Sequence, residues 1–405
     1  MKKFNKFLSV AVASAMVMTM TGCGNTDNGS AATGTNAATE SAAASDSAAS
    51  GSVFKIGGIG PTTGGAAVYG LAVQHGAEIA VEEINAAGGV NGYQLEFKFQ
   101  DDEADAEKSV NAYNALKDWG AQIIDGSTTS GACIAVTDKT KEDNMFQITP
   151  SGSAVECVQY DNNFRVCFSN PNQGLASAQY IGENGLAEKI AVIYDSSDVY
   201  SSGIYEKFAK EAENQPFEIV AAEAFTADNK TDFSVQLQKA KDAGADMVFL
   251  PIYYQESALI LTQAAAMGYA PKWFSCDGMD GILGGVDNFD VSLTEGVMLL
   301  TPFAADATDD LTQSFVTKYK EKYGDTPNQF AADSYDAIYV IKAAIEKSGV
   351  TPDMSVSDIC DGMKAAMTEI TVDGLTGSGM TWTADGEANK APKAVVIENG
   401  AYKAM

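Results

Sequence analysis

The sequence has little positive charge and very little of two residues on which many active sites depend. Its 405 residues hold 26 basic side chains against 54 acidic ones, a formal net charge of −28. His75 is the only histidine and Arg165 the only arginine. An acidic surface repels phosphate backbones, so nucleic acid is not an expected partner. A single histidine excludes multi-histidine metal sites, and the composition favours a binding protein over a hydrolase or kinase.

Cysteine is scarce too, and no C-x-x-C pair occurs, so zinc ribbons and thioredoxin-like redox chemistry are not supported. Besides Cys23 there are five cysteines, and this odd number leaves at least one free or paired between chains. Cys157 and Cys167 are close enough in sequence to bridge, which stays open. We expect no cofactor and no metal.

The N-terminus has the features of an export signal. Three lysines precede an apolar run from Phe7 to Met20, which is too short to span a bilayer with its flanks. Met20-Thr21-Gly22-Cys23 then resembles a bacterial lipobox. That resemblance implies a signal peptide over residues 1–22 and lipid on Cys23. The alternative is an ordinary signal peptide with an incidental cysteine.

Residues 24–52 contain almost no large apolar side chain and cannot bury enough surface to offset their ordering entropy. We therefore expect 23–52 to be a lipidated cysteine followed by a flexible tether. The rest of the chain is long enough for two or three domains.

Short apolar runs alternate with helical patterns along the rest of the chain. Ile190–Tyr194 and Met247–Leu250 are nearly continuous apolar runs, typical of strands covered on both faces. Between such runs, apolar residues recur with a helical period, for example from Ala77 to Ile84. The pattern predicts an α/β fold with parallel-rich sheets.

One internal similarity suggests two lobes of like topology. Residues 117–121 and 241–245 read Lys-Asp-Trp-Gly-Ala and Lys-Asp-Ala-Gly-Ala, and each precedes an apolar strand. Chance is the alternative, because a helix that ends in glycine before a strand is common. If the lobes face each other, the loops at their strand ends, near Ser130 and near Tyr253, meet in one cleft.

The two halves offer different chemistry at those strand ends. In the first half, Ser130 follows one strand and Ser151 and Ser153 follow the next, and we expect a helix to start after each of these loops. Hydroxyl and amide groups at helix starts suit a carboxylate. They are alternatively plain caps and turn residues. In the second half Asp277 accompanies tyrosines and suits an ammonium group, unless it is an exposed loop aspartate. A zwitterion needs donors for its carboxylate and an acceptor for its ammonium, and the two halves together offer both.

The chain resembles the leucine/isoleucine/valine-binding group of ABC-transporter solute-binding proteins, which have the type I periplasmic-binding fold. The likeness covers nearly all of 53–401. It rests on the lipobox and on the following segments: the Gly60-Pro61 turn with Tyr69, Ile84–Gly92, Asp101-Asp102, Ile148–Ser151, and Tyr335-Asp336-Ala337.

The resemblance implies roles for eight residues. Ser130, Ser151 and Ser153 match positions that hold the head group of an α-amino acid, and Asp277 matches an acidic position facing the ammonium. Aromatic positions that line or close the pocket match Tyr69, Tyr200, Tyr253 and Phe330. The family's disulfide beside the first loop is not reproduced, because Thr129 stands where a cysteine is expected.

The resemblance also implies two Rossmann-like lobes joined by three crossings that form a hinge. We place the crossings near Ser169-Asn170, Thr301-Pro302 and Asp373-Gly374. Lobe 1 would then comprise 53–169 plus 302–373, and lobe 2 would comprise 170–301 plus 374–405.

These features together predict a lipid-anchored, extracytoplasmic receptor of an ABC importer. We expect a monomer on the outer face of the cell membrane that captures a free amino acid, branched or otherwise apolar, and delivers it to a permease. One alternative keeps the fold and changes the ligand to an amide, a short carboxylate or an aromatic acid. A sensor or adhesin would use the same cleft, and an extracellular enzyme would have only His75 to serve as its histidine base.

Overall fold

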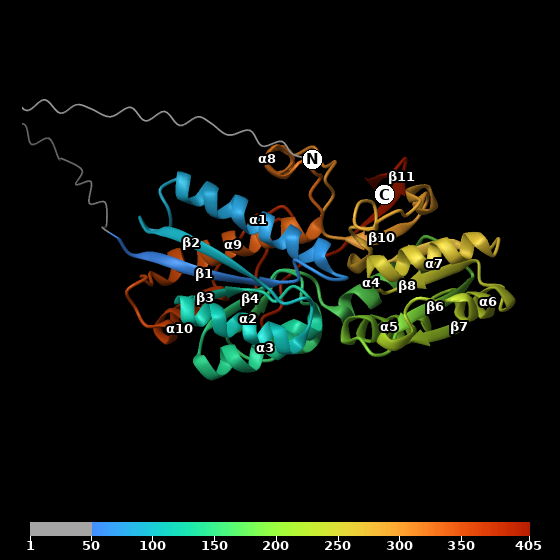
Figure 1. The fold of residues 1–405 in the computed structure, drawn as a ribbon, viewed down its shortest axis with the longest axis horizontal. Helices are drawn as coiled ribbons and strands as arrows, with labels where there is room; N and C mark the ends of the chain where they lie inside the picture. The colour runs from blue at the N-terminus through green and yellow to red at the C-terminus, as the bar shows by residue number, and fades with distance from the viewer. Residues whose placement is uncertain (1–50) are drawn as a thin grey trace, which may run out of the picture. The chain divides into compact units, whose positions relative to one another are not determined.

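The computed structural model describes residues 51–405, shown in Figure 1. The predicted signal peptide (1–22), the lipidation site Cys23 and the tether (23–52), except for its last two residues, lie outside the described residues. Among the residues described, no helix combines the length and the apolar character needed to cross a membrane.

The first lobe contains a parallel five-stranded sheet in the order β2-β1-β3-β4-β5. Its strands are β1 (Val53–Gly60), β2 (Gln94–Asp101), β3 (Ile123–Asp125), β4 (Phe146–Thr149) and β5 (Asn163–Arg165). The three-residue strand β3 lies at the centre and is fully buried, whereas β2 lies at the edge and has exposed residues. This difference follows the sequence, where β2 alternates apolar and polar residues.

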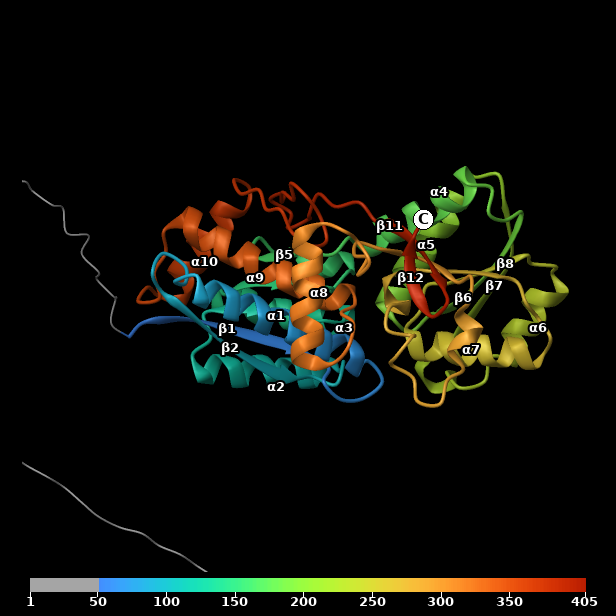
Figure 2. The same ribbon diagram turned by 90° about the horizontal axis from the view of Figure 1, so that it is seen from above.

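Helices cover both faces of this sheet (Figures 1 and 2). They are α1 (Ala67–Ala86), α2 (Ala106–Trp119), α3 (Ser130–Asp143), α8 (Asp310–Tyr323), α9 (Gln329–Ser348) and α10 (Val356–Met367). Helices α1 and α9 pack on each other over one face, where Phe54 and Ile56 are buried. Helices α2 and α3 pack together over the other face, where Ile59 and Ile124 are buried. Cover on both faces explains why β3 and β4 are buried at every residue.

The second lobe contains a seven-stranded sheet in the order β12-β11-β10-β9-β8-β6-β7. Strands β6 to β10 are parallel to one another, β11 pairs antiparallel with β10, and β12 pairs antiparallel with β11. The strands are β6 (Lys189–Asp195), β7 (Glu218–Phe225), β8 (Met247–Leu250), β9 (Lys272–Ser275), β10 (Met298–Thr301), β11 (Lys393–Glu398) and β12 (Ala401–Ala404). The helices around it are α4 (Asn170–Glu183), α5 (Val199–Ala212), α6 (Ser234–Asp242) and α7 (Tyr254–Ala266).

The two sheets repeat one topology. The order β2-β1-β3-β4-β5 corresponds strand for strand to β7-β6-β8-β9-β10. The similar segments at 117–121 and 241–245 occupy equivalent places, each between a helix end and the strand beside the first strand of its lobe. The prediction of an α/β fold with two lobes of like topology is therefore confirmed.

The chain passes between the sheets three times. It leaves the first sheet after β5, returns after β10 to form α8, and enters the second sheet again after α10 to form β11. The predicted crossings near Ser169-Asn170, Thr301-Pro302 and Asp373-Gly374 fall on these three connections. The exact lobe boundaries stay a prediction.

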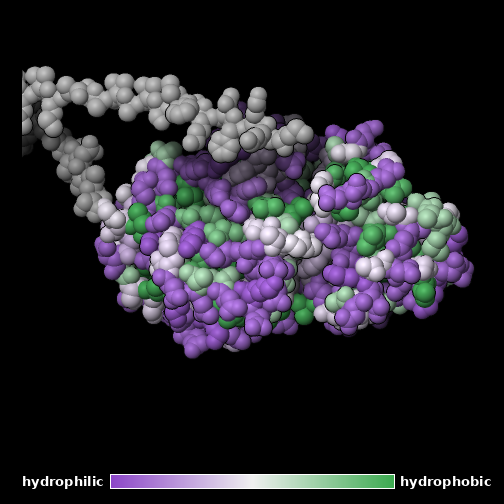
Figure 3. All heavy atoms as spheres, viewed as in Figure 1, coloured by the Kyte–Doolittle hydropathy of each residue, from purple (hydrophilic) through white to green (hydrophobic). Residues whose placement is uncertain are grey.

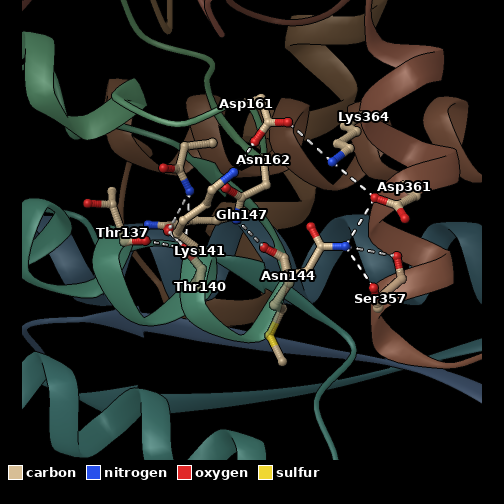
Figure 4. A network of polar contacts seen from close by, with 12 residues as sticks. Thr137, Thr140, Lys141, Asn144, Gln147, Asp161, Asn162, Ser357, Asp361 and Lys364 are labelled. Carbon is tan, nitrogen blue, oxygen red and sulfur yellow. Dashed lines mark hydrogen bonds and ion pairs between the residues drawn. The ribbon is translucent and has the colours of Figure 1, made fainter.

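Polar contacts fasten α10 to the first lobe (Figure 4). The Asn144 side chain, just after α3, donates to the backbone and side chain of Ser357 and to Asp361. Lys364 bridges Asp361 and Asp161. The face of the molecule seen in Figure 3 is largely hydrophilic, as the net charge predicts.

Candidate functional site

The first polar shelf is built where β3 ends and α3 begins. Ser130 is the first residue of α3, and its Oγ accepts hydrogen bonds from the backbone N–H groups of Ser153 and Ala154, at 3.2 and 3.1 Å. Because both bonds use Oγ as an acceptor, the hydroxyl proton remains available to donate. Ser130 is therefore poised to donate to an anionic group, as the carboxylate role requires.

The loop after β4 supplies the rest of this shelf. The Ser151 hydroxyl donates to the carbonyl of Thr128 at 2.7 Å, so it has acceptor capacity left. The Ser153 and Thr129 hydroxyls are buried without a hydrogen-bond partner. Buried hydroxyls without partners are uncommon, and a ligand that hydrogen-bonds Thr129, which lines the cavity described below, would satisfy that group.

The prediction that a regular helix starts after Ser153 is wrong. Only a short 3-10 helix, η1 (Val155–Val158), follows. The Arg165 guanidinium occupies the carbonyls of Gly152 and Ala154 with bonds of 3.2 and 2.9 Å. Those carbonyls do not start a regular helix, and the chain turns instead into β5. Only one of the two loops, the one at α3, thus carries a full helix N-terminus.

The second shelf centres on Asp277, at the start of the 3-10 helix η3 (Asp277–Met279). Its Oδ1 accepts from the Tyr200 hydroxyl at 2.7 Å and its Oδ2 from Nε2 of Gln173 at 2.8 Å. The side chain is only 4% exposed, so the alternative of a solvated loop aspartate is wrong. Burial raises the pKa of Asp277 to about 7, although the bonds from Tyr200 and Gln173 lower it.

Four aromatic rings stand between the shelves. The rings of Tyr200 and Tyr253 stack with centroids 5.0 Å apart, and the Tyr69 and Phe330 rings lie 4.3 Å apart. The Tyr69 hydroxyl donates to the carbonyl of Gly278 and accepts from the Tyr254 N–H at 3.2 Å. Tyr69 on α1 therefore links the first lobe to the second.

Seven of the eight residues predicted from the sequence line one small cavity of about 10 Å³. They are Tyr69, Ser130, Ser151, Tyr200, Tyr253, Asp277 and Phe330. Ser153 does not line it, and contributes its backbone N–H to Ser130. The space equals about one water-sized sphere, so a larger ligand requires the lobes to separate first.

Sequence reasoning missed several residues here. Thr128, Thr129 and Gly278 also line the cavity, and their places in the loops already singled out were the available signal. Gln173 and Gln329 hold Asp277, the second through a 2.8 Å bond to its carbonyl. These glutamines lie on α4 and α9, far from Asp277 in sequence, and no local motif marks them.

The arrangement suits recognition better than bond breaking. Donors from the first lobe face an acidic acceptor from the second across aromatic walls, which is the complement of a small dipolar molecule. His75 is half-buried and stacks on Tyr323, away from this cavity. Among residues 51–405, no group of three metal-binding side chains is placed to hold an ion.

Comparison with known proteins decides the family. A family model described as "Periplasmic binding protein" matches residues 53–401. The chain belongs to the periplasmic binding protein family. Periplasmic binding proteins are extracytoplasmic, and the two-lobed fold with a cavity between the lobes is the expected one.

Relatives within this family are similar over most of the chain. The leucine-, isoleucine-, valine-, threonine- and alanine-binding protein of Pseudomonas aeruginosa is 31% identical over 302 residues, which cover 73% of this chain and 78% of that protein. The Leu/Ile/Val-binding protein homolog 3 of Brucella melitensis is 30% identical, over 74% of this chain and 80% of that one.

Solved structures of periplasmic binding proteins have the same fold. The branched-chain amino acid transporter substrate binding protein LivJ of Streptococcus pneumoniae, in complex with isoleucine, matches with a TM-score of 0.78 and 28% identity, over 87% of this chain and 98% of that one. A solute binding protein of Rhodopseudomonas palustris, in complex with benzoate, matches with a TM-score of 0.76 over 87% of this chain and 95% of that one. Its sequence is 20% identical, and a likeness at this identity shows the fold alone.

Proposed function

We propose that this periplasmic binding protein captures a free α-amino acid with an apolar or branched side chain between its two lobes. The observation that carries the proposal is the pairing of Ser130 and Asp277 in one buried cavity, with a hydroxyl donor on one wall and a carboxyl acceptor on the other. The carboxylate of an amino acid matches the first and its ammonium the second. The names of the relatives, which bind leucine, isoleucine and valine, support this ligand class.

The aromatic walls would hold the ligand's side chain. Tyr69 and Phe330 come from the first lobe and Tyr200 and Tyr253 from the second, so an apolar side chain between them is desolvated only when the lobes close. Closure therefore couples recognition of the side chain to recognition of the head group.

A second candidate ligand is an organic acid without an ammonium group, such as benzoate. Both Asp277 oxygens already accept hydrogen bonds, and the raised pKa of about 7 lets the group be protonated near neutral pH. A neutral carboxyl group needs no cation, and its own O–H can donate to a carboxylate.

We propose further that the protein is the anchored receptor of an ABC importer. The lipobox at Met20–Cys23 supports a lipid anchor on Cys23, and membership of the family supports delivery to a membrane permease. That the protein acts as a monomer is part of this proposal. Changing Cys23 to Ser should release the protein from the membrane fraction of the producing cell, whereas wild type should remain with it. Equal release of both would contradict the anchor.

Calorimetric titration with each of the twenty amino acids, and separately with benzoate, tests the ligand class. Saturable heat with leucine, isoleucine or valine supports the first candidate, and heat with benzoate alone supports the second. No heat with any amino acid at millimolar concentration would remove the amino-acid proposal.

A further inference from the structure

Two buried thiols lie behind the first polar shelf, which consists of Ser130 and the loop that carries Ser151 and Ser153. We call it the hydroxyl shelf below. Cys133, on α3, and Cys157, on η1, form a small apolar cluster with Ala154. Both cysteines are fully buried, and all five cysteines among the described residues are free thiols. The disulfide between Cys157 and Cys167, left open by the sequence, is thus not formed, and Cys157 faces Cys133 instead.

The thiols contact the same backbone that builds the shelf. The Cys157 thiol donates to the carbonyl of Ser130 at 3.6 Å. The Cys133 sulfur accepts from Nε2 of Gln147 at 3.6 Å, and a Cβ added to Gly152 would meet it at 3.0 Å. Gln147, labelled in Figure 4, is itself held by Thr140. The pair therefore sits between α3 and the loop that carries Ser151 and Ser153.

The surroundings of the pair shift the pKa values of the two thiols in opposite directions. Burial raises the pKa of Cys133, but its contacts with the Cys157 and Thr149 side chains and the charge of Arg165 outweigh this effect, so the net shift is downward. Burial and the neighbouring Cys133 raise the pKa of Cys157. A thiol of lowered pKa beside a second thiol is the arrangement of a nucleophile and its resolving partner.

We propose that Cys133 and Cys157 form a reversible disulfide that braces the hydroxyl shelf, with a small extracytoplasmic disulfide as the oxidant. The Cys133 thiolate attacks one sulfur of the external disulfide and expels one small thiol. Cys157, after losing its proton, attacks the sulfur of Cys133 and expels the second. Two protein thiols and one disulfide thus become one protein disulfide and two small thiols, and electrons and protons balance.

The oxidant would reach the buried sulfurs through the short helix η1. It is four residues long, and its Val155 is 54% exposed although Cys157 is fully buried. We expect the opening of this single turn to expose the Cys157 sulfur, and with it the adjacent Cys133 sulfur, without unfolding α3. The bond would close a loop of about 25 residues that contains Ser151 and Ser153, and so restrict the segment that positions Ser130.

Peptide mapping of the full-length chain tests the proposal. One sample is treated with oxidised glutathione and another with dithiothreitol, and both are alkylated, digested without reduction and analysed by mass spectrometry. We expect a cross-linked peptide pair containing Cys133 and Cys157 only in the oxidised sample, lighter than the two free peptides by two hydrogen atoms. The oxidised protein should melt about 5–10 °C higher, as a loop of this length implies.

Variants supply the controls. Cys133→Ser and Cys157→Ser should each abolish the cross-link and the rise in melting temperature, and Cys360→Ser, which removes a buried thiol on α10, should keep both. Cross-linking of Cys157 to Cys167, or full alkylation of both thiols after oxidation, would overturn the proposal. A cross-link without a change in melting temperature would overturn the bracing role. The map of the unmutated protein decides the pairing even if a variant fails to fold.

Discussion

The Tyr200 hydroxyl donates a hydrogen bond of 2.7 Å to Oδ1 of Asp277, and the same hydroxyl oxygen accepts the backbone N–H of Gly278 at 2.8 Å. Tyr200 thereby fixes the carboxyl group relative to its own backbone. Gln173 fixes the other oxygen, so Asp277 has little freedom to turn away from the cavity. An acceptor held this firmly costs a ligand little reorganisation.

Changing Asp277 to Asn should weaken the binding of an α-amino acid by about 2–5 kcal/mol, because the ligand's ammonium would be buried without a counter-charge. Calorimetry on the amino acid that binds wild type measures the change. Asp287→Asn, an exposed site further along the same loop, is the control and should leave affinity unchanged. Equal affinity of the Asp277→Asn variant for that amino acid would contradict the pairing of Asp277 with the ligand's ammonium group.

Binding of an amino acid should weaken in acid. With a pKa of about 7 in the closed structure, Asp277 is mostly protonated there at pH 5, and the ligand's ammonium must displace that proton. Affinity should fall about tenfold per pH unit below pH 7, or about 100-fold at pH 5. The neighbouring Asp333 is paired with Lys390 at 2.7 Å, so measuring Asp277→Asn over the same range isolates Asp277. A carboxylate that binds protonated Asp277 would show the opposite trend.

Changing Ser130 to Ala should reduce amino-acid affinity by about 1.5–3 kcal/mol, the usual worth of a hydrogen bond to a charged group. The variant also strands the N–H groups of Ser153 and Ala154, so its melting temperature must be measured as well. Ser130→Thr keeps a hydroxyl and should retain more of the affinity than Ser130→Ala. Wild-type affinity in Ser130→Ala would remove the carboxylate role of this side chain.

Changing Tyr69 to Phe should speed ligand release while leaving the ring contact with Phe330 in place. The variant loses the bond from α1 to the Gly278 carbonyl, which holds the two lobes together in the closed state. We expect a loss of about 0.5–1.5 kcal/mol, seen mainly as faster dissociation in stopped-flow fluorescence. Tyr93→Phe, outside the cavity, should behave as wild type.

The protein should be more stable at pH 5 than at pH 8. Burial raises the pKa of Asp125 to about 7 and those of Asp102 and Asp336 to about 6. Unfolded aspartates titrate near 3.9, so between these values the native state binds more protons and the free energy of unfolding falls as pH rises. Melting temperatures at both pH values test this. Asp125→Asn should flatten the dependence, and a higher melting temperature at pH 8 in wild type would contradict it.

Local patterns in the sequence predict the fold class and most residues of the candidate site. Continuous apolar strands, amphipathic helices and the two similar helix ends predict paired α/β lobes, because these patterns report burial on one or both faces of each element. Strand ends in parallel sheets share an edge, so Ser130 and Ser151 could be grouped from their positions alone.

Contacts between groups far apart in the sequence could be seen only once the chain was folded. That Gln173 and Tyr200 hold Asp277, that Cys157 lies beside Cys133 rather than Cys167, and that η1 replaces a regular helix all follow from contacts between separate elements. Such contacts depend on how helices dock on their sheets and on one buried arginine, Arg165, and local residue preferences do not encode them.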